Sequence, residues 1–230
     1  QVHNVNTWET RRQRWMDRFL NRWRTAMIAV SEEVKRDVVA NLGCPPEFVR
    51  VLYNGIEIEN YAGRRPDPEL RQCLGIAENE KVVVVLARIV PQKRHTHLLQ
   101  ALARVRDEIP PARLLLVGGG KLRDDLEREA RERGLSEMVT FTGHRDDVAD
   151  ILALADVSAL TSDREGFSNA IVESLAAGVP VVATDVGGNA EAVVHGESGW
   201  LVRPGDLAGL ANALETVLTD DGLRRRMAAA

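Results

Sequence analysis

Two glutamates eight positions apart, Glu165 and Glu173, frame the stretch of the chain with the most chemical content. Glu165 precedes a short turn, Gly166-Phe167-Ser168-Asn169, and Glu173 falls about one turn inside the helix that the following apolar spacing predicts. The last two turn residues are suited to cap this helix, whose first free amides would favour an anion. Amides for a phosphate and carboxylates for sugar hydroxyls suit a phosphate ester that carries hydroxyl groups. The alternative is an ordinary helix start with two solvated glutamates.

Two cations form a second candidate group. Arg88 ends a predicted strand, and Lys93 begins the next helical region after Pro91. An arginine grips phosphate with a bidentate fork, and a lysine supplies a mobile point charge, so the pair can bracket a diphosphate. The alternative is a pair of unremarkable surface cations.

Two glycine-containing stretches and one missing motif bear on the nature of the ligand. Gly118-Gly119-Gly120 follows a strand but lacks the spacing of a dinucleotide fingerprint or a P-loop, so we interpret it as a turn lining a nucleotide cleft. In Phe141–Arg145, the side chains of His144 and Arg145 either line this cleft or are solvated. The sequence contains no Asp-x-Asp metal motif, which predicts that cations and helix amides meet the diphosphate charge without a metal ion.

Apolar runs of strand length alternate with amphipathic helices from residue 68 to the end of the chain. This alternation predicts an α/β domain with a doubly wound, Rossmann-like parallel sheet. Ligands of such sheets bind beyond the carboxyl ends of the strands, where Arg88, Gly118, His144, Asp163 and Thr184 all follow predicted strands.

The first 67 residues are organised differently. An amphipathic helix is predicted over Trp8–Arg24, and its tryptophans and arginines indicate either packing on its own domain or contact with an anionic lipid surface. A strand over 26–30, a helix that Ser31 caps and that runs to about Asn41, and a strand over 48–53 follow. We predict that residues 1–56 are the tail of one domain, that polar residues 57–67 are a linker and that residues 68–230 form a second domain.

Composition limits the classes of partner. The 230 residues are 44% hydrophobic and 28% charged, and the net charge of −4 argues against nucleic acid. Cys44 and Cys73 have no companions for a zinc site and favour a reducing compartment. Because no apolar run of membrane length and no signal peptide are recognisable, we expect a cytoplasmic protein, at the inner face of the membrane if the Trp8–Arg24 helix binds lipid.

The string from Glu165 to Gly188 resembles the signature of the family-four retaining glycosyltransferases: two glutamates separated by seven residues, then GVPVVAT and a glycine pair. The Arg88 and Lys93 stretch resembles the diphosphate motif of the same family, with Ala87 in place of its usual glycine. The resemblance implies a GT-B fold, in which two Rossmann-like domains face each other across a cleft. The chain would then be the donor-binding half with the tail of the other domain.

The resemblance also implies residue roles. Arg88 and Lys93 would neutralise the diphosphate, Glu165 would hold the donor sugar beside the 166–169 amides, and Glu173 would bind the ribose. His144 and Arg145 would lie near the base, and His3 near the donor sugar.

The implied reaction moves a sugar from a nucleoside-diphosphate sugar, with UDP favoured over GDP, to an unidentified small-molecule, sugar or lipid-linked acceptor. Retention at the anomeric carbon and a role in cell-envelope polysaccharide or glycolipid synthesis follow from the resemblance, with no cofactor beyond the donor. The alternatives are an inactive nucleotide-sugar binding module and a sugar-nucleotide epimerase. We expect this chain by itself to bind donor without transferring sugar.

Overall fold

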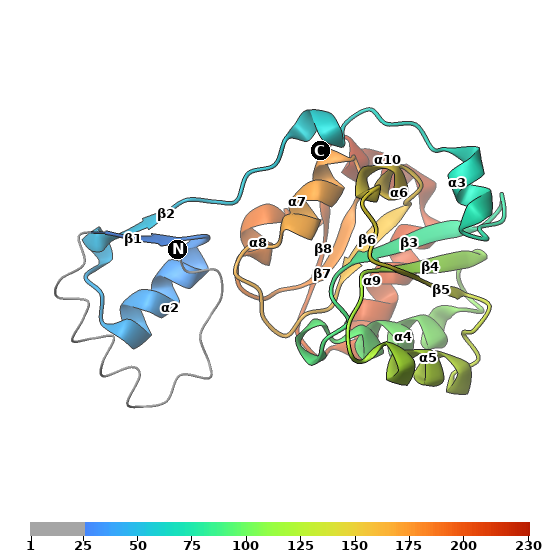
Figure 1. The fold of residues 1–230 in the computed structure, drawn as a ribbon, viewed down its shortest axis with the longest axis horizontal. Helices are drawn as coiled ribbons and strands as arrows, with labels where there is room; N and C mark the ends of the chain where they lie inside the picture. The colour runs from blue at the N-terminus through green and yellow to red at the C-terminus, as the bar shows by residue number, and fades with distance from the viewer. Residues whose placement is uncertain (1–25) are drawn as a thin grey trace.

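The computed structural model describes residues 26–230, which form two parallel sheets (Figure 1). The small sheet pairs β1 (Met27–Ala29) with β2 (Val49–Val51), and helix α2 (Glu32–Leu42) connects them. The large sheet has six strands in the order β5-β4-β3-β6-β7-β8, and all neighbours are parallel. Its strands are β3 (Lys81–Leu86), β4 (Ala112–Val117), β5 (Val139–Gly143), β6 (Val157–Leu160), β7 (Val181–Thr184) and β8 (Gly199–Val202).

Helices cover both faces of the large sheet, because its strands are apolar on both sides. In β3, Val83 and Val85 pack in the cluster that contains α4, α5 and α9, whereas Val82 and Val84 pack with α6 on the opposite face. This confirms the predicted doubly wound, Rossmann-like fold. The helices are α3 (Pro68–Cys73), α4 (His95–Val105), α5 (Arg123–Glu132), α6 (Val148–Ala153), α7 (Asn169–Ala176), α8 (Asn189–Ala192), α9 (Leu207–Thr219) and α10 (Asp221–Ala228).

The strand order reverses between β3 and β6. The chain builds β3, β4 and β5 outward in one direction and then returns to place β6, β7 and β8 on the other side of β3. Loops that leave the carboxyl ends of β3 and β6 therefore diverge, and such a switch point is where open α/β sheets bind ligands. The loops in question are residues 87–94 and 161–168.

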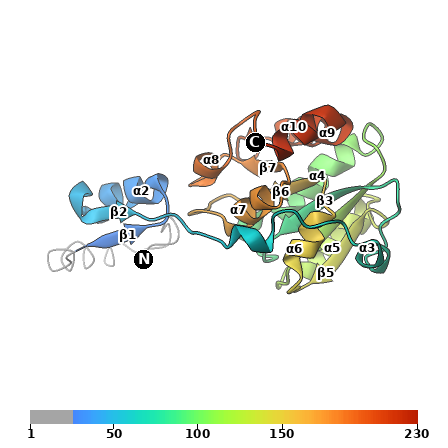
Figure 2. The same cartoon turned by 90° about the horizontal axis from the view of Figure 1, so that it is seen from above.

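Residues 26–56 lie beside the α7 and α8 end of the large sheet, as both views show (Figure 1 and Figure 2). An extended stretch with one 3-10 turn, Ile58–Asn60, leads from them to α3. Ser31 caps α2 as predicted, since its hydroxyl accepts the amide of Val34 at 3.1 Å. The predicted strand over 48–53 is shorter and spans Val49–Val51. His3 and the predicted Trp8–Arg24 helix lie outside the described residues.

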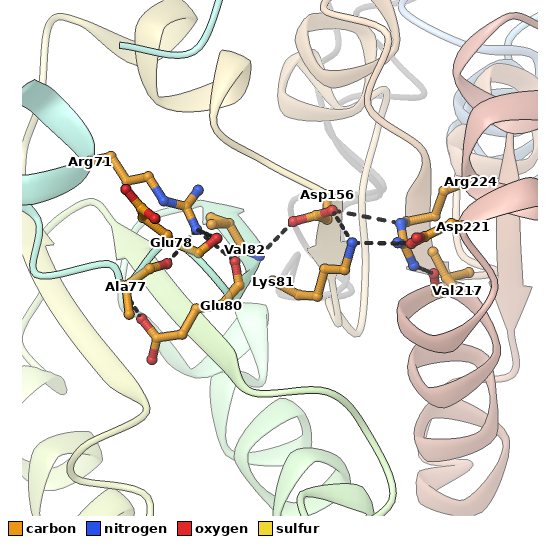
Figure 3. Close-up of polar contacts among 10 residues, drawn as sticks. All are labelled: Arg71, Ala77, Glu78, Glu80, Lys81, Val82, Asp156, Val217, Asp221 and Arg224. Carbon is orange, nitrogen blue, oxygen red and sulfur yellow. Dashed lines mark hydrogen bonds and ion pairs between the residues drawn. The ribbon is translucent and has the colours of Figure 1, made fainter. Parts of the chain in front are cut away.

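A charged cluster closes the amino-terminal edge of the large sheet (Figure 3). The Lys81 ammonium lies 3.3 Å from Asp156 and 3.1 Å from Asp221, and Asp156 also accepts the amide of Val82. The buried Arg224 side chain pairs with Asp221 and donates to the carbonyl of Val217. This cluster holds α10, a helix that the sequence analysis did not predict, against the starts of β3 and β6.

Candidate functional site

A buried ion pair occupies the switch point. The Lys93 ammonium nitrogen lies 2.5 Å from Oε1 of Glu165, and their side chains are 15% and 10% exposed. The pair joins the loop after β3 to the loop after β6, across 72 positions of sequence. The structure thus brings together two predicted site residues that the sequence analysis placed in separate groups.

The loop that carries Lys93 is braced from the end of β6. The Thr161 hydroxyl lies 3.0 Å from the carbonyl oxygens of both Lys93 and Arg94, and the Asp163 amide donates to the carbonyl of Gln92 at 2.9 Å. The Arg94 guanidinium pairs with Asp163 at 2.6 Å. Arg94 has a φ of 46°, a left-handed conformation that is uncommon for a residue other than glycine. These contacts hold the backbone of Lys93 and Arg94 in place. In the sequence, the only indication of them was that Asp163 follows a predicted strand.

Two glycines at the end of β7 support the turn that follows Glu165. The Gly188 amide donates to the carbonyl of Gly166 at 2.9 Å. A Cβ at Gly187 would lie 1.7 Å from the carbonyl oxygen of Glu165, and one at Gly188 would lie 2.4 Å from that of Gly166. Neither position has room for a side chain, so the glycine pair fixes the backbone that presents Glu165.

Helix α7 starts directly after this turn and points its first amides toward the switch point. Ser168 occupies the N-cap position, but its side chain accepts no capping hydrogen bond, which corrects the expected role. Asn169 is the first helical residue and accepts a hydrogen bond from Asn54 at 2.9 Å instead. Within residues 26–230, the amides of Asn169, Ala170 and Ile171 donate no hydrogen bond, so they are available to an anion.

Glu173 lies one turn into α7, half-buried beside Tyr61 of the extended stretch. Burial raises the pKa of Glu173 above its ordinary value, and a hydrogen bond from Tyr61 partly opposes this rise. Burial and the charge of Glu173 raise the pKa of Tyr61 in turn. The Glu173 carboxylate is therefore a desolvated acceptor, which is suited to hydroxyl donors.

The raised pKa of Glu173 predicts a pH-dependent effect of Glu173→Gln on stability. A carboxyl with a raised pKa favours folding below its ordinary pKa, and this contribution is lost as pH rises through the raised value. Glutamine stays neutral, so the variant should gain stability relative to the parent chain between pH 4 and pH 7.5. Urea unfolding at both pH values measures this difference, and a constant difference would contradict the role of burial.

The remaining predicted site residues are distributed more loosely. Arg88 follows β3 with an exposed side chain and forms no ion pair within the described part of the chain. The His144 side chain is 88% exposed and 3.6 Å from Asp146, whereas Arg145 pairs with Asp147 at 2.5 Å. The structure therefore leaves Arg88 free to bind a ligand and commits Arg145 to a neighbouring carboxylate.

Main-chain atoms of the loops after β3, β4 and β5 approach one another closely. Gly118 has a φ of 138°, and a Cβ there would lie 2.2 Å from the carbonyl of Ala87. The Gly118 amide also donates to the carbonyl of Gly143 at 2.8 Å. Three loops thus meet closely at one edge, and the role of Gly118-Gly119-Gly120 as a turn that lines a nucleotide cleft stays a prediction.

Three further observations concern a metal site, a second cavity and membrane spans. Within residues 26–230, no group of three or more histidine, cysteine or acidic side chains could hold a metal ion, and the expectation of a metal-independent reaction stays a prediction. A cavity of about 320 Å³ lies at the opposite, amino-terminal edge, lined by Lys81, Asp156, Asp221 and Arg224. These four side chains pair with one another. Of the helices in the described part, none is long and apolar enough to cross a bilayer.

Comparison with known protein families identifies the family to which the chain belongs. The family model of the group 1 glycosyl transferases matches residues 66–230, which include Arg88, the Lys93–Glu165 pair and all of α7. The chain belongs to the group 1 glycosyltransferases. A second model, glycosyltransferase family 4, matches residues 1–60.

Relatives of this glycosyltransferase include proteins with assigned reactions. The chain is 33% identical over 183 residues to N-acetyl-alpha-D-glucosaminyl L-malate synthase of Bacillus anthracis, covering 80% of this chain and 48% of that protein. It is 29% identical over 212 residues to the UDP-Gal:alpha-D-GlcNAc-diphosphoundecaprenol alpha-1,3-galactosyltransferase of Escherichia coli, covering 90% and 54%. The chain spans about half the length of the curated relatives it matches.

The solved structure of Anabaena Alr3699/HepE in complex with UDP is similar to this glycosyltransferase, with a TM-score of 0.89 and 31% identity over 99% of this chain and 64% of that one. The same protein has also been solved with UDP-glucose, with a TM-score of 0.83 and 33% identity over 94% of this chain and 60% of that one. These neighbours confirm the GT-B type of fold.

Proposed function

We propose that the switch point of this glycosyltransferase binds a nucleoside-diphosphate sugar, with a UDP-sugar favoured over a GDP-sugar. The observation that carries the proposal is the buried Lys93–Glu165 pair beside the free amides at the start of α7. A cation and amides for the diphosphate then lie next to a carboxylate for the sugar. The structural neighbour that binds UDP and UDP-glucose supports this choice of donor.

The charges at the site suit the chemistry of sugar transfer. As the bond between the anomeric carbon and the diphosphate breaks, negative charge grows on the leaving group. Arg88 is exposed and forms no ion pair within residues 26–230, so it can grip the diphosphate, while the Lys93 ammonium shares its donors between Glu165 and the phosphate oxygens. Glu165 accepts hydrogen bonds from the sugar hydroxyls, and we assign it no nucleophilic role.

Glu173 and the glycine-lined edge would hold the nucleoside. The desolvated Glu173 carboxylate lies one turn beyond the α7 amides, where it can accept both ribose hydroxyls. The backbone of residues 118–120 and 143–145 would line the base. The exposure of His144 and the pairing of Arg145 with Asp147 favour backbone contacts there over contacts from these side chains.

For the whole protein we propose transfer with retention at the anomeric carbon, in cell-envelope polysaccharide or glycolipid synthesis, with residues 57–67 as the linker between the two domains. The relative that acts on a diphosphoundecaprenol-linked sugar supports a lipid-linked acceptor, and the reaction would take place at the cytoplasmic face of the membrane.

Arg88→Ala is expected to weaken UDP binding roughly 10- to 100-fold, the effect of one lost charge-assisted contact. Its stability should stay that of the parent chain, because Arg88 is exposed and has no partner within residues 26–230. Calorimetric titration with UDP, GDP and ADP measures both affinity and base preference. Arg104→Ala, another exposed arginine, is the matched control.

The outcomes separate the parts of the proposal. Failure of the parent chain to bind any nucleoside diphosphate would contradict the proposed function. Unchanged UDP affinity in Arg88→Ala alone would remove Arg88 from the site and leave the rest of the proposal in place.

A further inference from the structure

The carboxylate of Glu191, in the short helix α8, binds the start of helix α2. It accepts the backbone amides of Glu32 and Glu33, each at 2.9 Å, and the Tyr53 hydroxyl, also at 2.9 Å. The first of these contacts joins residues 159 positions apart in the sequence. In both views α8 is the helix of the large domain that faces α2 (Figure 1 and Figure 2).

These hydrogen bonds complete the capping of α2. The first amides of a helix have no partner within it, and here Ser31 satisfies only that of Val34. Glu191 satisfies the two amides before it, and its charge lies at the positive end of the helix dipole. A residue of the donor-binding domain is thus part of the N-cap of a helix that precedes the linker.

A second set of contacts joins the same two parts at the candidate site. The rings of Tyr53 and Phe167 lie 5.1 Å apart, and the side-chain Nδ2 of Asn54 donates to Oδ1 of Asn169. The same Asn54 nitrogen lies 3.4 Å from the carbonyl oxygen of Phe167. Residues 166–169, the donor loop of the proposed function, are therefore held from one side by the Gly187-Gly188 turn and from the other by Tyr53 and Asn54.

We propose that Glu191 is a positioning residue for the donor loop. By holding α2 and Tyr53, it keeps residues 53 and 54 against Phe167 and Asn169, and so it fixes the amides at the start of α7. The carboxylate touches neither donor nor acceptor and acts only through these neighbours. We call the contact of Glu191 with Glu32, Glu33 and Tyr53 the Glu191 clamp.

Charge and position fit this role. Glu32 and Glu33 are acidic, so a third carboxylate is unfavourable there unless its hydrogen bonds offset the repulsion. The hydrogen bond to Glu191 is the main cause of the raised pKa of Tyr53. Glu191 follows the glycine pair that supports Glu165 by only a few residues, so one segment braces the donor loop directly through Gly188 and indirectly through Glu191.

Amide hydrogen exchange of this chain without nucleotide tests the clamp. In Glu191→Ala we expect exchange to become about tenfold faster both at the start of α2 and at the amides of Val172 and Gly188, which donate hydrogen bonds to carbonyls of the donor loop. UDP affinity should fall severalfold in parallel; that readout rests on the proposed function, whereas exchange does not. Glu197→Ala, which removes an exposed glutamate nearby, should change neither. Glu191→Gln keeps one acceptor oxygen and should restore part of the protection.

Faster exchange confined to α2, with UDP affinity within twofold of the parent, would overturn the proposal, because Glu191 would then only cap a helix. Tyr53→Phe keeps the ring and removes one donor, so it should reproduce the pattern at smaller amplitude. If Glu191→Ala fails to fold, unchanged exchange at the amides of Val172 and Gly188 in Tyr53→Phe would overturn the proposal equally.

Discussion

Replacing Lys93 with alanine should lower the free energy of unfolding by roughly 3–5 kcal/mol and remove measurable nucleotide binding. The loss of stability arises because Glu165, whose side chain is only 10% exposed, would keep its charge without its partner 2.5 Å away. The loss of binding arises because the remaining negative charge repels a diphosphate. Denaturant unfolding and calorimetric titration with UDP measure the two effects.

A double variant separates the two effects. Lys93→Met combined with Glu165→Gln removes both charges, so stability should recover toward that of the parent while nucleotide binding stays lost. Lys121→Ala, at an exposed lysine, controls for the loss of one positive charge. A Lys93→Ala chain as stable as its parent would show that the ion pair does not form in solution.

Replacing Gly187 with alanine should be nearly as damaging, with a loss of roughly 3–5 kcal/mol. The new Cβ would lie 1.7 Å from the carbonyl oxygen of Glu165, and the φ of 55° disfavours any side chain. The clash is with backbone, so Glu165 and the turn after it must move, and UDP affinity should fall along with the melting temperature.

Gly205→Ala is the matched control for this substitution. Gly205 has a φ of 79°, but a Cβ there would meet nothing within 4 Å. This variant should therefore show only the backbone strain, about 1 kcal/mol, and keep its UDP affinity. Equal losses in the two variants would mean that conformation, and not contact with Glu165, explains the effect at Gly187.

The sheet could be predicted from sequence because its signal is local. The valine run of β3 is apolar at every position, which is typical of strands that helices cover on both faces. The loop that follows such a strand lies at the carboxyl edge of the sheet, where ligands bind. Ser31 was predicted as a cap for a similar reason, since its partner is three residues away. The carboxyl-edge position of Arg88 and Lys93 followed in the same way.

The contacts that assemble the site could not be predicted, because they join distant segments. Lys93 and Glu165 are 72 positions apart, and nothing in either stretch indicates that the two pair. Ser168 occupies the N-cap position without a capping hydrogen bond from its side chain, and the Asn169 side chain accepts a hydrogen bond from Asn54, 115 positions away. Glu191 likewise contacts residues that lie 138 to 159 positions earlier in the sequence.

The Glu191 clamp has a consequence for protein engineering. Recombining halves of related enzymes at residues 57–67 would preserve each sheet but would pair an α2 from one parent with an α8 from another. Glu191 accepts hydrogen bonds from main-chain amides of α2. An α2 from another parent can therefore make these two hydrogen bonds whatever side chains it carries at positions 32 and 33. The contacts of Tyr53 and Asn54 depend on side chains, so they must be carried over together with Phe167 and Asn169. Hybrids that exchange the four positions as one set should retain donor affinity better than hybrids cut at the linker alone.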